Sequence, residues 1–175
     1  SSQQLEAQIR SELEKQQAAK IAKQRIAQKP KCPSDIETFK DYLGYNLENI
    51  GLSAGSEYCA LLKEHLSKIL FQGIPVVINR NVGVTLMKCV ANALIGQPNV
   101  KKLAFSKDYS VEDVDNFLSS GGRVVCLDNF IGNCNETELL PLFDNYRDKV
   151  IFLTVAYDRT IYYVSREFLR YCHYL

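Results

Sequence analysis

Residues 73–94 read GIPVVINRNVGVTLMKCVANAL, and this stretch decides the fold. It opens with an apolar, β-branched run at 74–78, which predicts a buried strand. A polar turn at 79–81 and the glycine-containing segment 82–85 follow, and the apolar residues from Leu86 to Leu94 then recur with helical period. Strand, glycine-containing loop and helix in this order are the layout of a phosphate-binding loop, because the N–H groups at a helix start attract anions.

Apolar runs alternate with amphipathic stretches from here to the end of the chain. Strands are expected at 101–106, 123–129, 150–155 and 170–175. Helices are expected at 111–119, 135–146 and 164–169. Pro141 lies inside the second of these helices and should start or kink it. Such alternation predicts an α/β fold of three layers, in which helices cover both faces of a mostly parallel sheet of about five strands.

The first of three predicted helices before the central stretch lies in an N-terminal arm. Residues 3–29 contain no Gly or Pro, and their apolar residues Leu5, Ile9 and Leu13 recur every fourth position, which predicts a helical arm. Prolines at 30 and 33 break the pattern, so we place a basic arm or linker at 1–33 and the core at 34–175.

The start of the core carries further helix signals. Ser34 and Glu37 have the spacing of a capping box, which predicts a short helix through Tyr42. Apolar residues at helical spacing predict another helix at 56–71. His65 lies on that helix, and its expected role is packing rather than catalysis.

Composition is that of a water-soluble protein. The chain has 175 residues, 46% of them hydrophobic, and a formal net charge of +1. Residues 1–31 hold seven lysines and arginines against three glutamates, so a basic arm precedes a slightly acidic body. Such an arm is either a solvated helix or a contact for an acidic partner such as nucleic acid. The chain begins with serine, and we expect it to be a fragment of a longer polypeptide.

The cysteines and the longest apolar runs bear on localisation. None of the six cysteines is in CxxC spacing, and Cys89 and Cys126 sit in apolar segments where we expect buried, reduced thiols. No apolar run approaches the roughly 18 residues of a membrane span, and no signal peptide is apparent. We therefore expect a cytoplasmic location and no membrane contact.

The chain resembles the P-loop NTPases of the AAA+ type over roughly residues 34–175. Their phosphate loop reads G-x-x-x-x-G-K-[ST]. Laid on this pattern, Gly83 and Thr85 match, whereas Ile78 replaces the first Gly and Val84 replaces the Lys. The resemblance implies an ATP site formed by Asn79, Arg80, Asn81, Val82, Gly83, Val84, Thr85 and Leu86.

Two later strands also carry part of the resemblance. The run 124–129 looks like the Walker B strand, so Asp128 would hold Mg²⁺ together with Thr85, and Asn129 replaces the Glu that activates water. Asn can orient a water but cannot accept its proton at neutral pH. The run 151–156 looks like the sensor-1 strand, with Thr154 as the nearest polar candidate and Val155 or Ala156 as the alternative aligned positions.

A further segment, 158–161 followed by 168–170, is similar to a motif of McrB-type restriction motors. In AAA+ rings an arginine near this position reaches the neighbouring subunit's nucleotide, and Arg166 and Arg170 are the candidates. The chain stops where the family's helical lid would begin, so that lid is absent or cut off.

These observations lead to three functional hypotheses. The first is a divergent AAA+-like nucleotide-binding module with impaired ATP hydrolysis, which acts as an assembly or interaction domain through a protein partner or as a homo-oligomer. The second is an active ATPase motor of restriction or defence type that acts on nucleic acid. The third is a protein-interaction module that binds no nucleotide.

Overall fold

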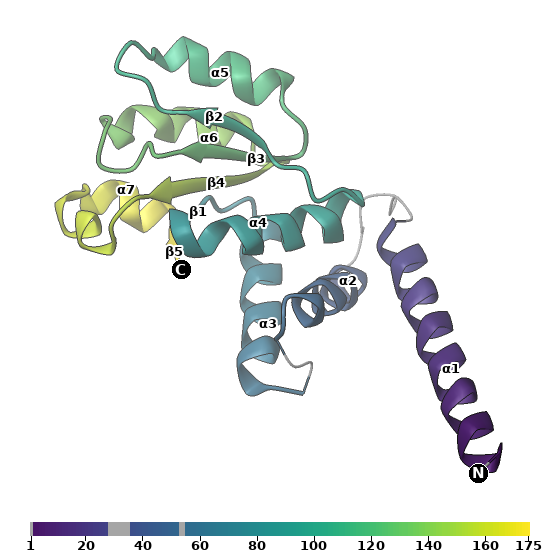
Figure 1. Cartoon of the computed structure of the whole chain (residues 1–175). Coiled ribbons are helices and arrows are strands. Elements are labelled where there is room, and N and C mark those ends of the chain that lie inside the picture. Colours follow the sequence, from purple (N-terminus) through teal and green to yellow (C-terminus); the bar gives the residue numbers. More distant parts are fainter. Residues whose placement is uncertain (1, 28–35, 53–54) are drawn as a thin grey trace.

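The computed structural model describes residues 2–27, 36–52 and 55–175, and its centre is a five-stranded sheet (Figure 1). All four strand pairings are parallel, and the strand order is β2-β3-β4-β1-β5. The strands are β1 (Val76–Asn79), β2 (Lys101–Ala104), β3 (Val124–Asp128), β4 (Val150–Val155) and β5 (His173–Tyr174). The prediction of an α/β fold with a parallel sheet is confirmed.

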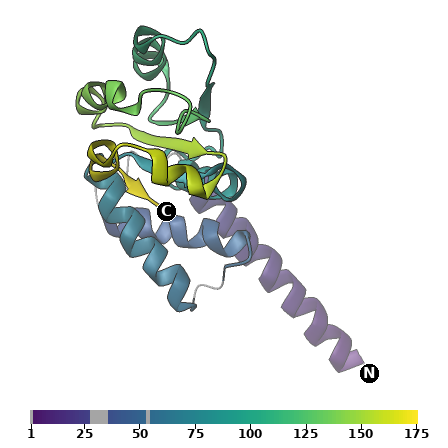
Figure 2. The same cartoon turned by 90° about the vertical axis from the view of Figure 1, so that its left-hand side faces the viewer.

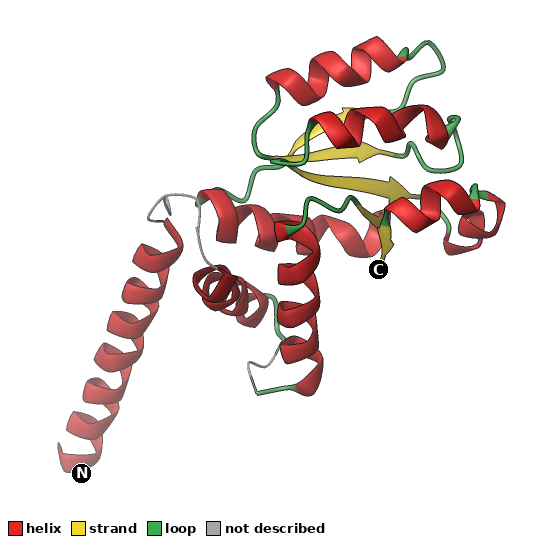
Figure 3. Ribbon diagram, turned by 180° about the vertical axis from the view of Figure 1, so that it is seen from behind, coloured by secondary structure: helices red, strands yellow, loops and turns green. Residues whose placement is uncertain are grey.

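Helices cover both faces of the sheet, as Figure 3 shows with the strands between two groups of helices. One face carries α2 (Ile36–Asn49), α3 (Glu57–Phe71) and α4 (Arg80–Ile95). The other carries α5 (Val111–Ser120), α6 (Leu140–Asn145) and α7 (Arg166–Tyr171). Short 3₁₀ helices, η1 (Glu136–Leu139) and η2 (Asp158–Tyr163), complete the connections.

Alternation along the central strands produces two separate cores. Val76 and Ile78 pack with α2, α3 and α4, whereas Val77 faces the other core with α5, α6 and α7. Successive side chains of a strand point to opposite faces, so a strand buried on both sides must be apolar throughout. All residues of β3 and β4 are buried, and all are apolar except Asp128 and Thr154, which lie at or near the carboxyl ends of these strands. Cys89 and Cys126 are buried as expected.

Local sequence signals set several helix ends. Ser56 caps α3, since its hydroxyl accepts from the Cys59 N–H. Ser110 and Asp113 form a complete capping box at the start of α5. Pro141 lies in the first turn of α6, where the backbone N–H has no partner within the helix, so the N–H that proline lacks is not needed. Of the two roles expected for Pro141, starting or kinking the helix, it therefore has the first.

Three boundaries differ from the expectations, and one expected boundary lies outside the described residues. The helix expected from Leu86 begins at Arg80, because Asn79 caps it directly at the end of β1. The helix expected to end at Tyr42 continues to Asn49, with Gly44 buried inside it. The last strand is limited to β5, because the preceding residues complete α7. The capping box at Ser34 and the domain boundary near residue 33 lie outside the described residues.

The expected N-terminal arm is a single helix, α1 (Ser2–Ala27), which extends away from the sheet (Figure 2). Leu5, Ile9 and Leu13 lie on its surface and are each more than half exposed. No described helix combines the length and apolar character that crossing a membrane requires.

Candidate functional site

The candidate site lies at the carboxyl ends of β1, β3 and β4. The chain leaves β1 for α4 on one face of the sheet, whereas it leaves the adjacent β4 for α7 on the other face. Neighbouring strands whose connections diverge in this way form a topological switch point, where ligands of open α/β sheets bind. Asn79 pairs in register with Val155 at this point, and Asp128 ends the next strand.

Asp128 is the central charge of the site. Its side chain is only 5% exposed, yet both carboxylate oxygens have partners. Oδ1 accepts a hydrogen bond of 2.7 Å from the Thr154 hydroxyl, and Oδ2 lies 3.2 Å from Nη2 of Arg80. A buried carboxylate is tolerated only when it is paired and hydrogen-bonded, so these two contacts account for its presence. Arg80, Asp128 and Thr154, which the sequence analysis singled out, therefore lie in contact at this site.

Asn129 adopts an unusual backbone conformation beside this group. Its φ is 61°, in the left-handed region that Asn tolerates better than most residues. Its N–H donates to the Thr154 hydroxyl at 2.7 Å, and its carbonyl accepts from the Asn133 side chain at 2.9 Å. The buried Oδ1 of Asn129 has no hydrogen-bond partner among the described residues. Thr154 therefore joins the ends of β3 and β4 through one hydroxyl that both donates and accepts.

Asn79 links the site to the segment after β4. Its Oδ1 accepts from the Asn81 N–H at 2.9 Å, and its Nδ2 donates to Asp158 at 2.9 Å. The Tyr174 hydroxyl donates to the same Asp158 oxygen. These donors, Asn79 first and Tyr174 second, lower the pKa of Asp158. Asp158 thereby ties η2 to both β1 and β5.

The glycine-containing loop expected at 82–85 is helical, and that expectation is corrected. Arg80 is the first residue of α4, which places Gly83, Val84 and Thr85 in its first two turns. Gly83 is buried, and a Cβ there would lie 2.8 Å from Cγ2 of Ile78. This glycine allows α4 to approach β1 closely, which gives it a packing role. Around it, Asn81, Val82, Val84 and Thr85 are exposed and Leu86 is half-buried.

These residues do not fit ATP with Mg²⁺ in the arrangement described. Thr85 lies on the exposed surface of α4, whereas both oxygens of Asp128 are engaged by Arg80 and Thr154. The described residues hold no group of three or more His, Cys, Asp or Glu placed to bind a metal. Asn129 brings an unpartnered oxygen but no charge.

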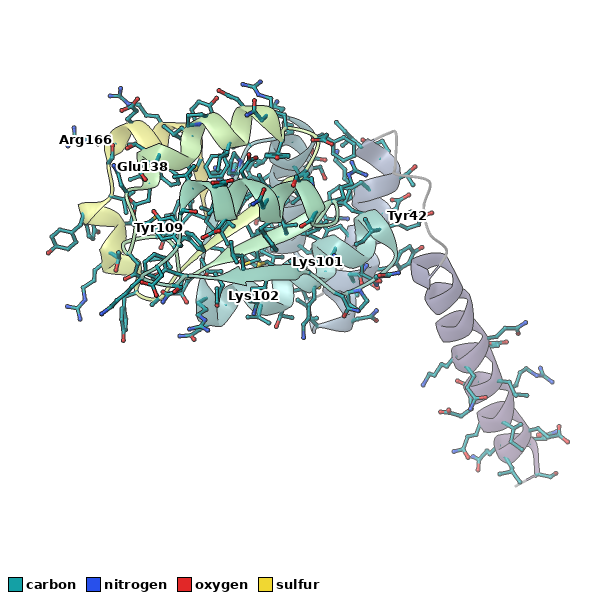
Figure 4. All side chains as sticks on the ribbon, turned by 90° about the horizontal axis from the view of Figure 1, so that it is seen from above. Tyr42, Lys101, Lys102, Tyr109, Glu138 and Arg166 are labelled. Atoms are coloured by element: carbon teal, nitrogen blue, oxygen red, sulfur yellow. The ribbon has the colours of Figure 1, made fainter. Side chains whose placement is uncertain are left out.

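The two candidate arginine fingers lie in different surroundings. Arg166 begins α7 and is exposed on the outer end of the molecule (Figure 4). Arg170 lines a pocket of about 270 Å³ with Gly73 and Pro75, which precede β1. Arg170 is thus at the amino end of the strands, whereas Asp128 is at the carboxyl end. Contact of either arginine with a neighbouring subunit stays a prediction.

Sequence reasoning missed the Arg80–Asp128 pair, the anchoring of Asp158 and a histidine pair. His65 and His173 lie with their Nε2 atoms 2.7 Å apart, although 108 positions separate them in the chain. Asn79 was a signal that the sequence did offer for the start of α4, since Asn directly after an apolar strand is a preferred helix cap. The pairs across the fold have no local signature.

The fold and site define an α/β protein with an all-parallel five-stranded sheet and a neutralised acid at its switch point. Comparison with protein-family models, with curated proteins and with solved structures finds no match.

Proposed function

We propose that this chain is an assembly or interaction domain built on an AAA+-like scaffold of the P-loop NTPase type, and that it works without binding or hydrolysing ATP. The observation that carries this proposal is the ion pair between Arg80 and Asp128. In the resembling family the equivalent acid holds Mg²⁺; here an arginine from the same chain supplies the compensating positive charge.

Three further features support the loss of catalysis. Val84 stands where the phosphate loop has its Lys, so the charge that meets the β- and γ-phosphates is missing. Asn129 stands at the position of the catalytic Glu, and an amide cannot accept the proton of an attacking water. The helical start of α4 removes the loop that would cradle phosphates. Loss of one electrostatic contact in phosphoryl transfer costs orders of magnitude in rate.

The scaffold itself supports an interaction role. A rigid α/β core can present surfaces to a partner without any catalytic group. The segment η2 displays Tyr162 and Tyr163, which are 88% and 87% exposed, and Asp158 anchors this segment to β1 and β5. Exposed tyrosines on an anchored segment are typical of protein-binding surfaces.

The proposal is tested by titrating the chain with ATP and Mg²⁺ and measuring phosphate release. We expect neither binding up to millimolar ATP nor turnover. Binding without turnover would assign the first hypothesis, a nucleotide-binding module with impaired hydrolysis. Turnover that disappears in Asp128→Ala would establish an ATPase and overturn the proposal; turnover that persists in this variant comes from a contaminant.

A further inference from the structure

The strand β2 lies at one edge of the five-stranded sheet. Among the described residues β3 is its single partner, and the side chains of Lys101, Lys102 and Ala104 are exposed. Figure 4 shows the two lysines along this outer strand. An uncovered edge strand offers unpaired backbone groups to another chain.

The hydrogen bonds to β3 identify which backbone groups are free. The Phe105 N–H donates to the Asp128 carbonyl at 2.9 Å, so residue 105 faces β3. Alternate residues of a strand direct their N–H and C=O groups to opposite sides, so Lys102 and Ala104 direct theirs away from β3. These two residues present donors and acceptors in the plane of the sheet.

A pocket of about 360 Å³ adjoins this edge on the α4 face. Its apolar lining comes from Val84, Met87, Val100 and Cys126, and the exposed lysines Lys88 and Lys102 also border it. Burial raises the pKa of Cys126 to about 12, so its thiol stays uncharged and the lining stays apolar. The volume is sufficient for one large apolar side chain.

We propose that the edge of β2 binds an extended acidic peptide segment as an added strand, with one apolar side chain of that segment in the adjoining pocket. Lys102 belongs to both the strand and the pocket, which makes the two features one continuous surface. In strand addition, backbone hydrogen bonds supply affinity and pockets for side chains supply selectivity. The inference rests on the proposed interaction role and names the chemistry of the partner.

Charge selects the acidic peptide over a second copy of this chain. If two copies of β2 paired edge to edge, Lys101 and Lys102 would face the same lysines of the other copy. Like charges opposite one another destabilise a sheet. Lysines on an edge strand also hinder unwanted strand pairing, but that role leaves the apolar pocket beside them without an occupant. An acidic segment with one apolar side chain would pair its charges with the lysines, hydrogen-bond to the backbone of the edge strand and fill the pocket.

The test begins with a library of random displayed peptides, which is selected for binding to the immobilised full chain without nucleotide. A selected peptide is then synthesised with a fluorescent label, and its affinity is measured by fluorescence anisotropy. We expect acidic sequences with one large apolar residue. The substitution Lys102→Glu should weaken binding about tenfold, because a charge reversal at a binding rim is worth about 1.4 kcal/mol. The matched control is Lys68→Glu, which reverses an exposed lysine on α3 and should leave affinity unchanged.

Backbone pairing is tested separately. Ala104→Pro removes an outward N–H without removing a bond to β3, and it should weaken binding, whereas Ala104→Val should not. Because a proline variant could misfold, the selected peptide is also synthesised with N-methylated backbone amides. N-methylation removes the peptide's hydrogen-bond donors and should abolish its binding to the unmodified protein.

Several results would overturn the inference. These are selection of no peptides or of peptides without acids, binding indifferent to Lys102→Glu and to N-methylation, and displacement of the peptide by a single-stranded oligonucleotide. A dimer that Ala104→Pro dissociates would assign the edge to a second copy. ATP turnover would overturn the proposed function alone, since peptide binding is read without nucleotide.

Discussion

The guanidinium of Arg80 lies 3.2 Å from Oδ2 of Asp128 and joins the first residue of α4 to the last residue of β3. The arginine side chain is 51% exposed, whereas the carboxylate is 5% exposed. The pair therefore sits at the boundary between solvent and core, where solvent weakens the attraction but the acid still needs a partner. This contact gives the buried carboxylate a positively charged partner.

Loss of Arg80 should destabilise the fold. In Arg80→Ala the buried carboxylate keeps Thr154 but no positive charge, so we expect a loss of about 1–3 kcal/mol in the free energy of unfolding, measured by urea denaturation. Adding Asp128→Asn should recover part of this loss. The matched control, Arg147→Ala, breaks the exposed pair with Asp144 and should cost less. Equal losses in both variants would contradict the structural role of the Arg80 contact.

Thr154 should matter through its hydroxyl. Thr154→Val keeps the shape but leaves the Asn129 N–H and one Asp128 oxygen without their partner, which should cost roughly 2–4 kcal/mol. Thr154→Ser keeps both hydrogen bonds and loses one methyl group, so about 1 kcal/mol is expected. Denaturant titration of the two variants distinguishes these effects; a serine variant as unstable as the valine variant would refute the assignment.

Two helix glycines should respond in opposite directions to alanine. Gly83→Ala places a Cβ 2.8 Å from the stiff Cγ2 of Ile78, and overpacking of this kind should cost about 1–3 kcal/mol. Gly44→Ala meets only the flexible Lys63 side chain at 3.3 Å, so the usual helix gain of up to about 1 kcal/mol should appear. Thermal unfolding measures both changes. A stable Gly83→Ala variant would reopen a loop role for 82–85.

The histidine pair should make stability depend on pH. Burial, and secondly the charge of His65, lower the pKa of His173, so the unfolded chain takes up a proton before the folded one does. The contribution of neutral His173 to stability should therefore be fully present above the pKa of histidine in the unfolded chain, about 6.5. It should decrease as the pH falls towards the lower pKa of His173 in the folded protein.

Unfolding measured between roughly pH 5.5 and 7, above the range of ordinary carboxyl groups, tests this dependence. Replacement by glutamine in His173→Gln removes the titrating group and should flatten the profile. His65→Gln keeps a polar contact without the charge and should reduce the slope. A wild-type slope that survives in His173→Gln would exclude the pair as its source.

The basic arm makes a nucleic-acid contact testable. If residues 1–31 bind DNA, affinity should fall steeply with salt, with a log–log slope of about −0.9 for each phosphate contacted. Binding is compared by anisotropy for the full chain and for a chain without these residues. A flat salt response, or equal affinity of both chains, would leave the arm as a solvated helix.

The sequence alone determined the alternation of strands and helices and therefore the class of fold. Apolar β-branched runs such as 76–78 can be buried on both faces, and this property is local. Asp128 and Thr154 were also readable in advance, because polar residues at or near the ends of parallel strands meet at one edge of the sheet.

Only the tertiary structure decided what the residues of α4 contact. The spacing of Gly83 and Thr85 suits a phosphate loop, but the cap at Asn79 and the packing of Gly83 on Ile78 make the segment helical. Likewise, the contacts of Arg80 with Asp128 and of His65 with His173 join residues far apart in the sequence, and no sequence periodicity predicts them. A local pattern fixes which backbone forms are favourable, whereas partners distant in sequence are fixed only by how the layers pack.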